Sequence, residues 1–215
     1  MFVGDVDLKM KFELVTSWDD GRKQDIRLAE LLRKYKLPAI FYIPIATREL
    51  TTWQIVDLAK DFEIGGHTIS HVHLNLVSEE IAKEEVIGCK NVLENLIGKE
   101  ITSFCYPRGR FNDMAKKIIK EAGFKDARTT KVLYVDSEDP FETRTSVHAY
   151  NRPEYNGEGW FKVAIDMLEK VKEYGGIYHL WGHSWEIDKY DWWNPLEELF
   201  KILRKELDEN SNIAI

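Results

Sequence analysis

Hydrophobic and polar positions repeat with two different periods in this chain. Segments of the two kinds alternate along the sequence. Short runs rich in β-branched and aromatic residues, such as 39–43 (AIFYI), predict buried strands, whereas apolar residues three or four positions apart predict amphipathic helices. The predicted strands are 11–16, 39–43, 62–66, 103–106, 124–129, 177–181 and a short last one at 212–215. The predicted helices are 25–35, 52–60, 78–96, 112–122, 160–174 and 195–207.

Strict alternation of strand and helix favours an α/β fold with parallel strands and helices outside the sheet, because right-handed crossovers place each helix on a covering face. We expect the sheet to close in a barrel-like way. A chain of 215 residues, 44% of them hydrophobic, suits one large core, so residues 1–215 are expected to form a single domain. In such a barrel, residues that carry chemistry follow the C-terminal ends of strands.

Polar residues able to bind a metal fall at those strand ends. Asp19 and Asp20 follow the first strand, His67 and His71 follow the third, and His183 follows the sixth. Two histidines four residues apart project from one face of a helical turn, and with a carboxylate they could hold one ion and leave a position open for water. Taken alone, the acidic pair could be a turn and the histidines a solvated helix face; their convergence on one mouth favours a metal site.

Composition and charge exclude several other classes of function. Lysine and arginine number 30 against 37 acidic residues, for a net charge of −7, and no basic block is present, so a nucleic-acid partner is not expected. The longest apolar run, 37–46, is too short to span a bilayer, and the N-terminus lacks the pattern of a secretory signal. We therefore expect a cytoplasmic protein without a membrane span; a homo-oligomer is left open.

Four motifs resemble those of the polysaccharide deacetylases, carbohydrate esterase family four, in order and rough spacing. They are 17–21 (SWDDG), 67–71 (HTISH), 106–112 (YPRGRFN) and 180–184 (LWGHS). The resemblance runs from about residue 12 to the C-terminus. It implies a distorted (β/α) barrel with about seven parallel strands, and metal-dependent removal of acetyl groups from N-acetylated sugars.

The resemblance also assigns roles by position. Asp20, His67 and His71 match the metal ligands, Asp19 the general base and His183 the general acid. The chemistry of amide hydrolysis asks for the same roles: a water acidified by a divalent ion, a base that takes its proton, and an acid that protonates the departing amine. Zinc is the preferred ion for two nitrogens and one carboxylate, with cobalt, nickel and iron as alternatives.

Two departures from the family pattern concern the groups that orient the catalytic residues. Cys105 stands where many members carry the arginine that orients the catalytic aspartate. Arg128, at the end of the fifth strand, is our preferred substitute, and Arg108 is a second candidate.

The acid histidine also lacks its usual partner. The stretch between Arg128 and motif 180–184 contains no Asp-Trp pair to match the motif that tunes this histidine in the family. We expect another carboxylate near His183, either Asp136 or Glu186.

Aromatic residues crowd the predicted mouth and suit a carbohydrate ligand, because flat rings cover the apolar faces of sugars. Ordinary core packing accounts for at least some of them. An amide N–H near Tyr106 is expected to meet the developing charge on the acyl oxygen. The candidate substrate-binding residues are Trp18, Tyr106, Pro107, Arg108, Trp181 and Trp185.

Three functions are compatible with these residues. The first is a metal-dependent deacetylase of an N-acetylated sugar, in polymer, oligomer or small glycoside form. The second keeps the fold and cleaves the ring amide, imide or ureide of a small molecule, as allantoinase-like and cyclic-imidase-like members do. The third is a carbohydrate-binding protein without catalysis, against which the intact set of candidate catalytic residues argues.

Overall fold

Seven parallel strands form one curled sheet in the computed structural model, which describes residues 12–211. The strand predicted at 212–215 lies outside the described residues. The order across the sheet is β5-β4-β3-β2-β1-β7-β6. The strands are β1 Phe12–Asp19, β2 Ile40–Ile43, β3 Glu63–Gly66, β4 Ser103–Cys105, β5 Asp126–Arg128, β6 Val147–His148 and β7 Gly176–Gly182.

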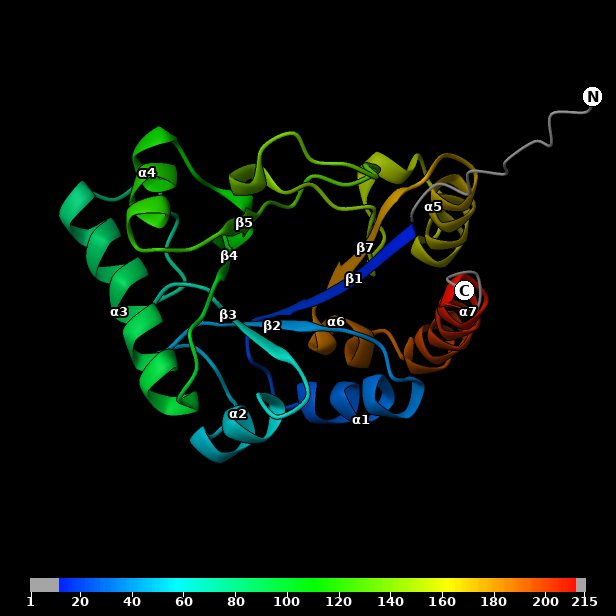
Figure 1. The fold of residues 1–215 in the computed structure, drawn as a ribbon, viewed down its shortest axis with the longest axis horizontal. Coiled ribbons are helices and arrows are strands. Elements are labelled where there is room, and N and C mark those ends of the chain that lie inside the picture. The colour runs from blue at the N-terminus through cyan, green and yellow to red at the C-terminus, as the bar shows by residue number, and fades with distance from the viewer. Residues whose placement is uncertain (1–11, 212–215) are drawn as a thin grey trace, which may run out of the picture.

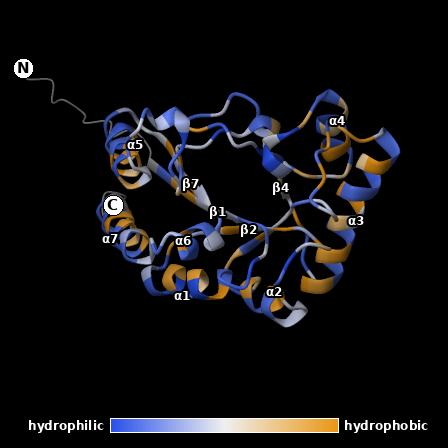
Figure 2. Ribbon diagram, turned by 180° about the vertical axis from the view of Figure 1, so that it is seen from behind, coloured by the Kyte–Doolittle hydropathy of each residue, from blue (hydrophilic) through white to orange (hydrophobic). Residues whose placement is uncertain are grey.

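Helices surround this sheet on its outer side (Figure 1). They are α1 Asp25–Tyr35, α2 Thr52–Leu58, α3 Glu79–Ile97, α4 Asp113–Glu121, α5 Trp160–Tyr174, α6 Ser184–Lys189 and α7 Trp193–Ser211. Short 3-10 turns lie at Pro107–Gly109, Pro140–Glu142 and Pro153–Tyr155. The outer helices carry both hydrophobic and hydrophilic residues, as helices half-buried against a sheet must (Figure 2). Of the helices in the described part of the chain, none is long and apolar enough to cross a membrane.

An extended segment, 143–148, joins the two edges of the sheet. At its start, the Thr143 amide donates a 2.9 Å hydrogen bond to the carbonyl of Ala127 in β5. Three residues on, the Ser146 amide donates to the carbonyl of His179 in β7 at 3.0 Å. The sheet therefore curls into a distorted (β/α) barrel, and the predicted fold class is confirmed.

Local chemistry sets where the elements begin and end. The Ser78 hydroxyl caps α3 by accepting from the Ile81 amide, and Gly98, with φ of 67°, ends the same helix in the left-handed conformation that glycine adopts without strain. Each helix predicted between residues 12 and 211 is present. The sequence pattern missed β6 and α6, which are too short for either period to appear, and α7 begins at Trp193, two residues before the predicted start.

Successive residues of β1 point to opposite faces of the sheet, and this alternation separates core from site. Trp18 is fully buried, and its ring packs edge-on against Phe200 of α7 with the ring centroids 6.3 Å apart. Asp19 therefore points the other way, into the barrel. The C-terminal ends of β1, β3 and β7 then bring Asp19, His67 and His183 to one mouth.

Candidate active site

The two histidines of motif 67–71 lie in a loop after β3, and the predicted helical turn is wrong. Thr68 and His71 have φ angles of 65° and 58°, so the backbone doubles back on itself and turns both imidazoles to the same side. Glu85 of α3 holds this loop: one of its carboxylate oxygens accepts from the amides of Ile69 and Ser70, each at 2.8 Å. The four-residue spacing of the two histidines was a good signal. However, the buried carboxylate of Glu85, rather than helical geometry, fixes the positions of their imidazoles.

Asp20, His67 and His71 bring three ligand atoms around one point. Oδ1 of Asp20 lies 3.4 Å from Nε2 of His71 and 3.8 Å from Nε2 of His67. All three atoms lie within 4.8 Å of one another. Ligands of a tetrahedral zinc ion, bound at roughly 2.0–2.1 Å, stand about 3.3 Å apart, so small side-chain movements would close these atoms on an ion.

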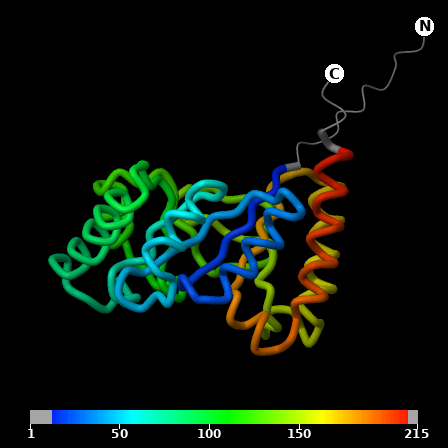
Figure 3. The backbone as a smooth tube through the Cα atoms, turned by 90° about the horizontal axis from the view of Figure 1, so that it is seen from below, coloured from blue at the N-terminus to red at the C-terminus, as the bar shows by residue number. Residues whose placement is uncertain are grey.

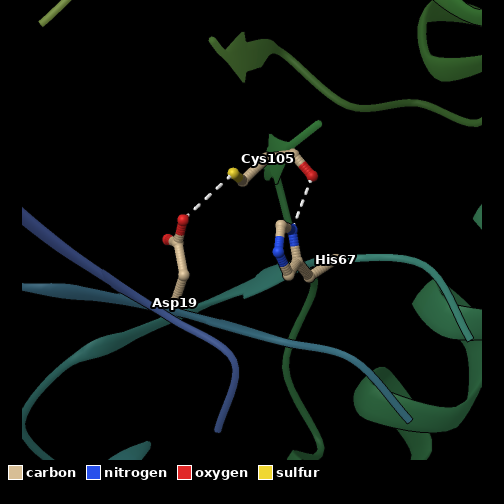
Figure 4. A group of neighbouring side chains, drawn as sticks. All are labelled: Asp19, His67 and Cys105. Atoms are coloured by element: carbon tan, nitrogen blue, oxygen red, sulfur yellow. Dashed lines mark hydrogen bonds between the residues drawn. The ribbon is translucent and has the colours of Figure 1, made fainter. Parts of the chain in front are cut away.

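Neighbouring groups orient the ligand atoms. Nδ1 of His67 lies 2.8 Å from the carbonyl oxygen of Cys105, to which it donates (Figure 4). This bond leaves the lone pair of His67 on Nε2, the nitrogen on the side of Asp20. Burial lowers the pKa of His67 to about 4, so its imidazole is neutral, as a ligand must be. The indole N–H of Trp185 donates to Oδ2 of Asp20 at 3.2 Å and leaves Oδ1 for an ion.

A second group, made of Asp19, His67 and Cys105, also gathers possible ligand atoms (Figure 4). Its thiol is ill suited to an ion. Burial raises the pKa of Cys105 well above its usual range, and a metal-bound cysteine must be a thiolate. The donor set of Asp20, His67 and His71 therefore fits a divalent cation better.

Asp19 is paired with Arg128 in the buried centre of the barrel. Nη2 of Arg128 donates to Oδ2 of Asp19 and also lies 2.8 Å from Sγ of Cys105. Burial alone would raise the pKa of Asp19, but the charge of Arg128, followed by the nearby imidazoles, lowers it to about 2. The carboxylate is thus ionised, and among the described residues its Oδ1 has no hydrogen-bond partner.

The small side chain of Cys105 explains how Arg128 reaches Asp19 from β5. Cys105 lies in register beside Arg128 on the neighbouring strand β4, and its sulfur lies 3.7 Å from Oδ2 of Asp19. The guanidinium passes over the short thiol to the carboxylate. Arg108, the other candidate, lines the cavity mouth and does not pair with Asp19.

Glu186 is the carboxylate next to the candidate acid His183. Its Oε2 accepts from Nδ1 of His183 at 2.7 Å and lies 3.0 Å from Nε2 of His148. Burial alone would lower the pKa of His183, but the bond to Glu186 and the charge of Asp19 raise it above its usual value. Asp136, the alternative partner, instead pairs with Arg144 at 2.7 Å.

Nε2 of His183, the atom not engaged by Glu186, faces the acidic pair. It lies 4.0 Å from Oδ2 of Asp19 and 4.0 Å from Oδ2 of Asp20. His148, which the sequence left without a role, stacks on Trp181 with ring centroids 3.7 Å apart. No spacing rule could have linked His148 to Glu186, because they lie 38 positions apart on different elements.

A cavity of about 290 Å³ opens over these groups. It combines acidic, imidazole, cationic and aromatic groups, and its lining residues are Asp19, Asp20, His67, His71, Arg108, Thr130, Trp181, His183 and Trp185. An acyl group of a few atoms can enter such a space and meet Asp19, His183 and the three ligand atoms together.

Three of the predicted substrate-binding residues are not among those that line this cavity. Trp18, Tyr106 and Pro107 are buried. The Tyr106 hydroxyl donates to the Phe141 carbonyl at 3.0 Å, and its amide donates to the Arg128 carbonyl at 3.1 Å. The predicted contact of these three side chains with substrate is therefore not met by this geometry. The Tyr106 amide itself is already engaged, and the use of an amide N–H near Tyr106 for the acyl oxygen stays a prediction.

The chain belongs to the polysaccharide deacetylase family. The family model named polysaccharide deacetylase matches residues 9–127, more than half of the chain. A peptidoglycan-N-acetylglucosamine deacetylase from Bacillus cereus is 28% identical over 130 residues, which cover 59% of this chain and 58% of that protein. The chain spans about half the length of the first curated relatives it matches, at 44% and 58%.

Solved structures support the fold alone, since their sequences are distant. A Mycobacterium smegmatis protein assigned to the polysaccharide deacetylases aligns with a TM-score of 0.69 at 15% identity, covering 94% of this chain and 86% of that one. A family-four pseudoenzyme from Bacillus anthracis aligns with a TM-score of 0.62 at 15% identity, covering 94% and 62%. Because this fold is also found in a pseudoenzyme, activity must be argued from the residues of the cavity.

Proposed function

We propose that this protein is a metal-dependent deacetylase that hydrolyses the N-acetyl group of an amino sugar. One observation carries the proposal: the ligand atoms of Asp20, His67 and His71 surround one point, and Asp19 and His183 line the same cavity. Membership of the deacetylase family supports the same reaction class.

The chemistry of the donor atoms indicates which residues would bind the ion. Asp20, His67 and His71 would hold a divalent ion, with zinc preferred for two imidazoles and one carboxylate. When bound, such an ion supplies a more acidic water and an electrophile for the acyl oxygen.

Asp19 and His183 then divide the proton transfers. Asp19 is ionised, and its Oδ1 is the atom that takes the proton of the attacking water, while Arg128 holds Oδ2 in place. His183 delivers a proton from Nε2 to the departing amine, because Glu186 accepts from its Nδ1 and favours the charged imidazole. The substrate amine leaves as a neutral amino sugar and the acyl group as acetate.

The decisive experiment measures acetate release from N-acetylglucosamine oligomers. We expect release that a chelator stops and added zinc restores, together with new free amines on the sugar. Turnover of a cyclic ureide or imide without acetate release would select the ring-amide reaction instead. Oligomer binding by the zinc-loaded protein with no turnover of either substrate class would indicate a binding protein.

A further inference from the structure

A second cavity, of about 140 Å³, lies inside the barrel at the end opposite to the catalytic cavity. It is lined by Ile40, Ser103 and Asp126, which are the first residues of β2, β4 and β5. Asp19, which lines the catalytic cavity, is the last residue of β1. Because the paired strands are all parallel, their first residues share one end of the barrel. Figure 3 shows β1, in dark blue, running from the upper edge of the molecule, where it begins, toward the lower edge, where it ends.

Three buried side chains form the wall of the second cavity that faces the catalytic end. They are Tyr42, Arg128 and His179. The guanidinium carbon of Arg128 lies 5.3 Å from the ring centroid of Tyr42, and the same guanidinium donates to Asp19. A molecule in the second cavity would therefore contact the group that holds the proposed base.

Aliphatic side chains form much of the remaining wall. They come from three strands and from the segment after β5, and they are Val15, Ile40, Val135 and Ile177. An apolar cavity of about this size stays dry and takes up one small carbon ring such as benzene. The size and the walls of the second cavity therefore favour a small organic molecule over a group of waters.

The two arginines that line the second cavity are already compensated. Arg128 pairs with Asp19, and Nη2 of Arg144 lies 2.7 Å from a carboxylate oxygen of Asp136. An anionic ligand would have to compete with one of these carboxylates. The arginines therefore do not favour an anion in this cavity.

Asp126 is the charged group of the second cavity that lacks a counter-ion. It lies two positions before Arg128 on β5, so both side chains point into the barrel. Its two carboxylate oxygens accept from the Ser103 hydroxyl at 2.8 Å each, and no basic side chain between residues 12 and 211 pairs with it. Burial raises the pKa of Asp126 to about 6, so the carboxylate is ionised at neutral pH. The cavity thus presents one uncompensated negative charge beside an apolar wall.

We propose that the second cavity binds a small apolar molecule that carries one primary ammonium group, with the ammonium on Asp126 and the hydrocarbon part beside Ile40 and Ile177. An ammonium has three N–H donors, which the carboxylate and the hydroxyl oxygen of Ser103 can accept. The inference goes beyond the proposed deacetylase function and does not depend on it, since no described residue lines both cavities.

The experiment titrates cyclohexylamine, which is an ammonium at neutral pH, into the zinc-loaded protein by calorimetry. Cyclohexanol is its neutral match. The wild type should bind the amine about 10-fold or more tightly than the alcohol, because a hydrogen bond to a charged group adds to the apolar contact that both share. Asp126→Asn should lose this difference and keep the affinity for the alcohol, since the amide retains the shape of the carboxylate.

Asp136→Asn is the matched control. It removes a carboxylate of the same cavity that already has Arg144 as its partner, so the affinity for cyclohexylamine should stay close to that of the wild type. Equal losses of amine affinity in Asp126→Asn and Asp136→Asn would indicate general attraction to negative charge and would overturn the inference. Absence of amine binding by the wild type would overturn it as well.

Methyl NMR locates the bound amine independently of its affinity. The methyl signals of Ile40 and Ile177 should shift as cyclohexylamine is added, because both side chains line the second cavity. The methyl signals of Ile187, the buried neighbour of Glu186 on α6, should stay in place. Shifts at Ile187 without shifts at Ile40 and Ile177 would place the amine at the catalytic end and would contradict the inference.

Discussion

Asp19, the proposed base, illustrates how one buried ion pair can prepare a carboxylate for proton transfer. Arg128 binds one carboxylate oxygen, and the other oxygen has no partner among the residues that the structure describes. The pairing keeps the carboxylate ionised in a site that burial alone would neutralise. Because Asp19 is not one of the three proposed ligands, the base and the metal ligands can be tested separately.

Asp19→Asn should keep the metal and lose turnover. The amide side chain retains an oxygen for Arg128 but cannot accept a proton, so acetate release should fall about 100- to 10,000-fold. Metal analysis of the same sample should give the wild-type content, which also shows that the protein has folded despite the unpaired charge of Arg128. A variant with the wild-type rate would overturn the assignment of the base.

Glu186→Gln should change the pH profile of the reaction. Glu186 raises the pKa of His183, and the acid must be protonated to act, so removing the charge should move the alkaline limb of the kcat profile to lower pH. Asp188→Asn, on the same helix α6 but exposed, is the matched control. A profile that shifts equally in both variants would count against a specific action of Glu186 on His183.

At the scale of elements, helix α3 holds the loop that carries two of the proposed metal ligands. The carboxylate of Glu85 accepts hydrogen bonds from two amides of this loop, and Glu85 itself is only 8% exposed. Hydrogen bonds from backbone amides to a carboxylate are shorter and stronger than those between neutral groups. The loop is therefore held by an element that contributes no ligand.

Glu85→Ala should weaken metal binding while leaving every ligand in place. The loop amides would lose their acceptor, and we expect metal affinity to fall about 10- to 100-fold, as for other groups that orient ligands. Competition with a chromogenic chelator measures this affinity. Glu84→Ala, the exposed neighbour on α3, should bind metal as the wild type does; equal losses in both variants would indicate a general effect on the helix instead.

A buried carboxyl also joins the first turns of α1 and α6. Oδ1 of Asp25 accepts from the Ser184 hydroxyl at 2.5 Å, and burial raises the pKa of Asp25 to about 7. The unfolded chain, with a pKa near 3.8, loses this proton first. Stability contributed by the neutral carboxyl is therefore present below pH 4 and is lost as pH rises from about 4 to 7, by up to about 1.4 kcal/mol per pH unit.

Asp25→Asn should remove this loss, because an amide stays neutral and keeps an oxygen for Ser184. The unfolding midpoint of the metal-free protein should rise by several degrees at pH 8 and change little at pH 4. Asp113→Asn, at the exposed first position of α4, provides the control. A gain that is the same at both pH values would show that the titration of Asp25 is not its cause.

For the molecule as a whole, the sequence was informative where a periodic pattern or a motif extends over many residues. The alternation of strands and helices predicted the barrel, and the strand ends predicted that Asp19, His67 and His183 would meet. The prediction that Trp18 lines the cavity is wrong, because alternation along β1 places Trp18 on the face opposite to Asp19, where it packs on Phe200.

Partners distant in sequence were also beyond prediction. The place of Arg128 at the end of the fifth strand predicts that it pairs with Asp19, and that pairing is present in the structure. Glu85 and His148 gave no signal, because their roles depend on contacts between elements that pack only in the folded chain. Long-range packing, rather than local propensity, determines such contacts.

An ion bound at the mouth would join the ends of β1 and β3, so it should stabilise the whole fold. A ligand that binds only the folded state adds about 2.7 kcal/mol at a free concentration 100 times its dissociation constant, which is about 5–10 °C in the unfolding midpoint of a domain this size. Zinc should raise the midpoint of the wild type by this amount, and a chelator should reverse the gain. His67→Ala should lose the gain and Asp19→Asn should keep it, since only His67 of these two residues is a proposed ligand. Equal midpoint shifts in the wild type and His67→Ala would mean that zinc binds elsewhere, and the proposed metal centre would have to be abandoned.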